Sequence, residues 1–170
     1  MFLQLLKENR YVSLILTALR IYLGWQWLQA GLGKITSGEF DASGFMYGAV
    51  KNMTGEHPSV QPWWGNFLKD VAIPYVDFFN VIVPWGEFLV GLGLLLGVFT
   101  SFSVLMGLTM NFAYMFSGTT STNPQMIVLG MFILAAGFNA GKIGLDRWLN
   151  PFLKSVLFKE GKQTRIPQDA

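Results

Sequence analysis

The stretch Pro84–Thr100, PWGEFLVGLGLLLGVFT, decides the fold that we predict for this chain. It is an apolar run that contains one carboxylate, Glu87, and a row of glycines. Extended upstream to about Tyr75, it has the roughly 20 apolar residues that a helix needs to cross a bilayer. Gly93 and Gly97 form a GxxxG pair, which lets a second helix approach closely. Because a carboxylate in such a helix is costly, we expect Glu87 to face protein and to have a partner.

The composition of the whole chain also indicates a membrane protein. Of the 170 residues, 52% are hydrophobic and 13% are charged, against about 25% charged residues in a typical soluble domain. Charged residues are scarce in four long stretches, at about 12–33, 74–99, 102–117 and 124–141. We therefore predict an all-α integral membrane protein, a four-helix bundle with an extended external connector between its first and second helices.

Basic residues are distributed unevenly between the two ends of the predicted bundle. Residues 34–71, which include the connector, have three cations and four acids. The basic residues after the fourth stretch are Lys142, Arg147, Lys154, Lys159, Lys162 and Arg165. The positive-inside rule then predicts a multi-pass protein of the cell membrane with both termini in the cytoplasm. We assign residues 1–150 to the four-helix transmembrane domain and residues 151–170 to a basic cytoplasmic tail.

The sequence excludes several classes of redox site. It has no cysteine, which rules out disulfide exchange and thiolate-bound metals or clusters. Its one histidine, His57, rules out a haem held by two histidines of one chain. No glycine-rich nucleotide fingerprint follows a strand-like segment. We therefore predict no metal site, no covalently bound cofactor and no nucleic-acid partner; electrons would come from a bound substrate or another subunit.

One face of the first predicted helix differs from a lipid-facing surface. Arg20, Gly24, Trp27, Gly31 and Lys34 are spaced i, i+4, i+7, i+11 and i+14. At 3.6 residues per turn, all five point within about 40° of one direction. This face therefore combines two cations, two glycines and an indole, and we expect it to face protein.

Counting about 1.5 Å per residue from the inner ends of the helices groups the buried polar residues by depth. Arg20, Glu87 and Asn111 fall in one layer about 14–20 Å deep, and Lys34 and Asp77 both fall at about 34 Å. We therefore predict an Arg20–Glu87 pair with Asn111 beside it, and a Lys34–Asp77 pair at the outer rim. Such pairs can serve only to fix helix register. We favour that structural role for Lys34–Asp77 and leave both roles open for Arg20–Glu87.

Two further patterns concern the outer end of the bundle. Asn111 and Tyr114 share one face of the third predicted helix. Trp63 and Trp64 lie in the connector. Indoles are enriched at the headgroup level, so we interpret this pair as an interfacial anchor in preference to a lid that contacts a ligand.

These motifs resemble the DoxX/DoxD-like family of four-helix membrane proteins. The resemblance rests on R-x3-G-x2-W-x3-G-x2-K from Arg20 to Lys34 and on E-x3-G-x-G-x3-G-x2-T from Glu87 to Thr100. The G-x2-G-x-D run from Gly141 to Asp146 agrees, and the resemblance covers about residues 12–150. It implies a link to thiosulfate:quinone oxidoreductase, as its membrane subunit, and to quinone or oxidative-stress responses.

The favoured function is the membrane subunit of a quinone-linked oxidoreductase, with a quinone as the candidate cofactor. The predicted catalytic residues are Glu87 and Arg20, and the predicted ligand-binding residues are Trp27, Gly24, Gly31, Asn111, Lys34 and Asp77. One alternative is a non-catalytic membrane scaffold for a soluble oxidoreductase; a small carrier is less favoured. The expected partners are the lipid bilayer, an oxidoreductase subunit and a second copy of the chain. Whether the chain is itself an enzyme stays open.

Overall fold

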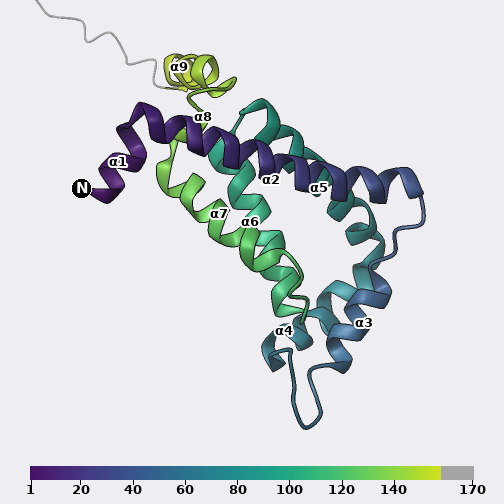
Figure 1. Cartoon of the computed structure of the whole chain (residues 1–170). Helices are drawn as coiled ribbons and strands as arrows, with labels where there is room; N and C mark the ends of the chain where they lie inside the picture. The colour runs from purple at the N-terminus through teal and green to yellow at the C-terminus, as the bar shows by residue number, and fades with distance from the viewer. Residues whose placement is uncertain (158–170) are drawn as a thin grey trace, which may run out of the picture.

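The computed structural model describes residues 1–157, and within that range the chain is all-α, with no strand. The helices are α1 Phe2–Glu8, α2 Arg10–Ser37, α3 Ser43–Lys51, α4 Pro62–Phe67, α5 Val76–Leu96, α6 Thr100–Phe116, α7 Asn123–Ala136, α8 Phe138–Gly141 and α9 Asp146–Leu157. Figure 1 shows two arms, one of α2 and α5 and one of α6 and α7, which diverge from the end that carries α8. Helices α3 and α4 lie at the opposite end.

The long first helix, α2, has well-defined ends. The Asn9 side chain accepts hydrogen bonds from the backbone N–H groups of Tyr11, at 2.8 Å, and Val12, at 3.1 Å. This cap satisfies donors that the first turn leaves unpaired. At the other end Gly38 has φ of 66°, a left-handed conformation that glycine adopts without a Cβ penalty.

Close helix contact in the first arm depends on glycines. A Cβ built on Gly24 would lie 2.9 Å from the Leu95 nitrogen, and one on Gly31 would overlap the backbone at Phe88. On α5, a Cβ on Gly91 would overlap the backbone at Leu28. The backbones of α2 and α5 therefore touch at three glycines, as in close-packed membrane helices.

The second predicted helix begins earlier than its sequence pattern indicated. Helix α4, a π-helical turn at Leu68–Ala72 and a 3₁₀ turn at Ile73–Tyr75 lead without a break into α5. The continuous helix Pro62–Leu96 has 35 residues, and by length and apolar composition it can cross a membrane. Among residues 1–157 it alone meets both criteria; Asn123–Ala136 is apolar but shorter.

The connector between α2 and α5 is folded. Its helices enclose a small core of their own, separate from the core of the four long helices. That second core consists of Ala42, Met46, Ala49, Val60, Leu68 and Ala72. The Trp64 indole N–H donates a hydrogen bond of 2.8 Å to the Ser117 hydroxyl, which ties α4 to the end of α6.

The all-α prediction is confirmed, and α2, α5, α6 and α7 lie close to the four charge-poor stretches. The four-span arrangement stays a prediction, because one helix passes the length and hydropathy criteria within the described part of the chain. Helix α9 crosses the predicted domain boundary at residue 150, and the rest of the predicted basic tail, 158–170, lies outside the described residues.

Candidate ligand-binding site

A large apolar cavity lies between α5 and α6 and extends beneath the connector. Its volume is about 920 Å³, and its lining comes from α5, α6, the connector and the end of α2. Nearly all lining side chains are apolar or aromatic. The polar exceptions are Lys34, Glu87, Ser103, Thr109, Tyr114 and Ser117. Cavities of this size and composition, with a few polar groups on one wall, are typical of sites for small apolar molecules.

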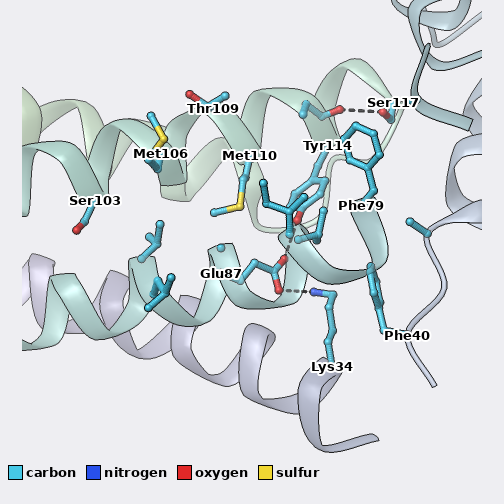
Figure 2. Close-up of a pocket in the computed structure, with 18 of the residues that line it drawn as sticks. Lys34, Phe40, Phe79, Glu87, Ser103, Met106, Thr109, Met110, Tyr114 and Ser117 are labelled. Carbon is cyan, nitrogen blue, oxygen red and sulfur yellow. Dashed lines mark hydrogen bonds and ion pairs between the residues drawn. The ribbon is translucent and has the colours of Figure 1, made fainter. Parts of the chain in front are cut away.

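Glu87 is the centre of the polar part of this cavity (Figure 2). Its Oε2 lies 2.5 Å from the Lys34 ammonium, and its Oε1 accepts a hydrogen bond of 2.7 Å from the Tyr114 hydroxyl. The Glu87 side chain is 2% exposed and that of Lys34 is 29% exposed. The two partners come from α2 and α6, so this cluster joins both arms of the bundle. A buried carboxylate is tolerated here because a cation and a hydroxyl both contact it.

The predicted Arg20–Glu87 and Lys34–Asp77 pairs are wrong. Among residues 1–153, whose side chains the structure describes, there is one ion pair, Lys34–Glu87. Arg20 instead donates hydrogen bonds to the carbonyls of Leu94, at 2.8 Å, and Ile143, at 2.7 Å. Asp77 is exposed on the first turn of α5.

The pairs differ because α2 is shifted along α5 relative to the register that equal helix depths predict. The predicted pairs require Tyr11 and Thr100 to lie at the same level near the inner surface, and Gly31 would then lie opposite Asn80. In the structure Gly31 lies against the backbone of Pro84 and Phe88, four to eight residues further along α5. This shift, roughly one to two turns, moves Lys34 rather than Arg20 to the level of Glu87.

The first turns of α2 explain the shift, because they extend past the inner end of α5. The Ser13 hydroxyl donates a hydrogen bond of 3.0 Å to the Asn139 carbonyl in α8. The Asn139 amide in turn donates to the Leu6 carbonyl at 2.8 Å. Residues near Tyr11 therefore pack on α8 and do not mark the level at which α5 ends.

Arg20 and Asp146 together fix the turn between α5 and α6. The Asp146 carboxylate accepts hydrogen bonds from the backbone N–H groups of Phe99, at 2.8 Å, and Thr100, at 2.9 Å, at the start of α6. The Arg20 guanidinium bonds a carbonyl in the last turn of α5, where a cation is favourable. Arg20 lies outside the large cavity, so its contacts are those of a residue that holds the fold.

Four other predicted ligand-binding residues also lie outside the large cavity. Trp27 is 4% exposed and, with Asn111, lines a small void on the other side of α5 and α6. Gly24 and Gly31 lie in the contact between α2 and α5. Of the eight predicted site residues, the structure places Glu87 and Lys34 on the cavity wall.

Sequence reasoning missed two residues of the site. Tyr114 shares a helix face with Asn111, but its hydroxyl was not matched with Glu87. Trp64 lines the cavity as well as bonding Ser117, so it is part of the connector wall and not solely an interfacial anchor. The aromatic contact between Phe45 and Tyr114, with ring centroids 6.0 Å apart, gave no signal in the sequence because it depends on how the connector folds.

The DoxX family profile matches residues 15–120, which is more than half of the chain. The chain belongs to the DoxX family. The DoxX match extends from α2 through α6 and includes every residue that lines the large cavity, whereas α7, α8 and α9 lie beyond it. No curated protein and no solved structure matches the chain. Membership of the DoxX family indicates a membrane protein, in agreement with the apolar helix Pro62–Leu96.

Proposed function

We propose that this chain is the membrane subunit of a quinone-linked oxidoreductase and that the α5–α6 cavity binds a quinone-like ligand. The observation that carries the proposal is the cavity itself, an apolar space of about 920 Å³ whose wall contains the Lys34–Glu87–Tyr114 cluster. A quinone is an apolar ring and tail with two carbonyls that accept hydrogen bonds. The cavity supplies apolar surface for the ring and tail, and the cluster supplies donors for a carbonyl.

The three polar side chains have suitable chemistry for this ligand. The Lys34 ammonium has three N–H donors, and Glu87 accepts one of them. The remaining donors can bond a carbonyl in the cavity. Lys34 also lies 5.6 Å from the centre of the Phe40 ring, a cation–π contact that holds its ammonium against the cavity wall.

Reduction of a quinone to a quinol takes up two electrons and two protons. In this proposal the electrons come from a partner oxidoreductase subunit. We assign the transfer of protons to Glu87, whose carboxylate lies on the cavity wall and accepts hydrogen bonds from Lys34 and Tyr114. The role of this chain is then to bind the ligand, exclude water from it and keep a titratable carboxyl group and hydrogen-bond donors beside it.

A blocked-cavity variant with a matched control tests the proposal. A Cβ on Gly86 would meet only the Met110 sulfur, at 3.6 Å, so Gly86→Leu extends into the cavity without striking backbone. Gly33 lies in α2 with open space around its Cβ position and does not line the cavity, so Gly33→Leu is the control. Decylubiquinone should raise the melting temperature of the wild type and of Gly33→Leu, since a ligand selective for the folded state stabilises it.

The Gly86→Leu variant should show little or no such shift while it melts as a folded protein without ligand. A saturable shift that is equal in all three proteins would place the ligand elsewhere and contradict the proposal. The absence of any shift in the wild type would leave the cavity without a quinone ligand.

We also propose that the chain crosses the cell membrane several times, with both termini on the cytoplasmic side. The support is that α1 and α9 both contact α8 and thus lie at one end of the molecule, while the connector lies at the other (Figure 1). The basic residues after α7 add to this support through the positive-inside rule.

A further inference from the structure

The Lys34–Glu87–Tyr114 cluster lies part-way along the cavity and divides it into two parts. One part, which we term the connector chamber, is lined by Phe40, Ala42, Met46, Trp64, Leu68 and Phe79. The other, the α5–α6 seam, is lined by Leu89, Leu92, Leu96, Phe99, Phe102 and Met106. In Figure 2, Phe40 and Phe79 lie on one side of Glu87, and Met106 and Ser103 lie on the other.

The two parts differ in how far they are closed. In the connector chamber Leu68 is 4% exposed and Met46 is 5% exposed, because the connector helices cover them. Along the seam Leu89 is 58% exposed and Phe102 is 62% exposed. Phe45 and Phe67 on the chamber wall are more exposed, at 40% and 39%, so the chamber is partly covered by the connector. The seam lies on the apolar outer surface of α5 and α6 and is more open.

The two parts also differ in the shapes of ligand that they suit. The chamber is rich in aromatic side chains, which pack against flat rings in offset or edge-on geometry. The seam runs from Glu87 to Leu96 along α5, a rise of about 13 Å. Its leucines and Met106, together with Phe99 and Phe102, form a long apolar track. A flat ring fits the more covered, aromatic part, and a flexible chain fits the more exposed track.

We infer that the ligand binds in one orientation, with its ring in the connector chamber and its tail along the α5–α6 seam. This inference rests on the proposed quinone binding. A quinone tail is attached next to a ring carbonyl, so a ring and tail placed in this way bring that carbonyl to the boundary between the two parts. The boundary is where Lys34 and Tyr114 lie. Because the seam is open, the tail can extend into the surrounding lipid. The site should therefore accept quinones with tails of different lengths.

Two quinones with the same ring test the orientation, decylubiquinone and its tail-less parent, dimethoxymethylbenzoquinone. Met106 lines the seam and is half-buried, and Met106→Trp should fill it. Since each buried methylene contributes to binding, this change should weaken decylubiquinone by about tenfold or more and leave the tail-less quinone nearly unaffected. Leu105→Trp, at an exposed neighbour that does not line the cavity, is the matched control.

Phe79 tests the chamber. Phe79→Ala removes a ring from the chamber wall and should weaken both quinones by a similar factor, whereas the exposed, non-lining neighbour Phe78→Ala should weaken neither. If Met106→Trp does not yield a folded protein, Leu92→Trp fills the same seam from α5. Binding is measured by calorimetry on purified protein in detergent.

The outcomes separate this inference from the proposal on which it rests. If neither quinone binds the wild type, the proposed function fails first. If Met106→Trp weakens both quinones equally, or Phe79→Ala weakens only the tailed one, quinone binding stands and the orientation is overturned. Equal competition by decanol, which has a tail and no ring, would show a general lipid groove and would also overturn the orientation.

Discussion

The two oxygens of Glu87 have different partners, and the two partners differ in exposure. Lys34 forms the ion pair with Oε2 and is partly exposed, whereas Tyr114 donates to Oε1 from the other arm of the bundle. Within this cluster the Glu87 carboxylate is buried, whereas the Lys34 ammonium is partly exposed to solvent. The consequence of removing a partner should depend on which charge is left behind.

We expect Lys34→Met to destabilise the protein more than Glu87→Gln. Loss of Lys34 leaves a buried carboxylate unpaired, at a cost of roughly 3–5 kcal/mol for a buried pair. Loss of the Glu87 charge leaves an ammonium that can remain hydrated. The carbonyl of the introduced amide still accepts from Tyr114, so the cost should be about 1 kcal/mol. Thermal unfolding of the two variants in detergent measures the difference.

The double change Lys34→Met with Glu87→Gln should recover much of the loss, because it strands no charge. Lys51→Met, at the exposed end of α3, serves as the control for loss of a lysine and should have little effect. Equal losses for the two single changes, or simple additivity in the double variant, would mean that the ion pair does not control stability here.

At the scale of the element, glycines set the distance between α2 and α5. Gly31 and Gly33 are two residues apart in α2, yet they face different surroundings. A Cβ at Gly31 would overlap the backbone of α5, which cannot move aside as a flexible side chain can. A Cβ at Gly33 meets nothing within 4 Å.

Gly31→Ala should therefore lower the melting temperature, with a cost of about 1–3 kcal/mol from forced separation of the two helices. Gly33→Ala should be neutral or stabilising by roughly 0.5–1 kcal/mol, because alanine favours the helix over glycine. Thermal melts followed by circular dichroism give both values. A Gly31→Ala protein as stable as the wild type would show that α2 and α5 do not touch at this position.

At the scale of the whole molecule, the connector lies at the end opposite to α1, α8 and α9. The chain has no cysteine, so each introduced cysteine reports on one site alone. Ser37 and Glu56 are exposed at the connector end, and Lys7 and Lys142 are exposed near α8. All four positions are exposed on the protein surface. A difference in labelling between them therefore reports which side of the membrane each position faces.

Cysteines at Ser37 and Glu56 should react with an impermeant thiol reagent in intact cells, and those at Lys7 and Lys142 should react only after lysis. This is the result expected from the positive-inside rule for cytoplasmic termini. The reverse pattern would invert the proposed orientation, and labelling of all four sites in intact cells would contradict the multi-pass arrangement.

The sequence by itself determined the four long helices. Long charge-poor stretches predict such helices because hydropathy acts locally. Gly97, expected inside the second helix as half of a GxxxG pair, instead ends α5 in a left-handed conformation. The sequence also singled out Glu87 and Lys34, since a charge within an apolar helix needs a partner wherever it lies. The resemblance to the DoxX family is confirmed by the family match over residues 15–120, and the run from Gly141 to Asp146 lies beyond that match.

Only the tertiary structure decided which charged residues meet. Helix register depends on where the backbones touch, and the contact of Gly31 with Pro84 and Phe88 brings Lys34 to Glu87 and leaves Arg20 at the end of α5. The cavity likewise requires the connector to fold over α5 and α6, a long-range arrangement that no local pattern specifies. Local preferences fix each helix, whereas packing between helices fixes the site.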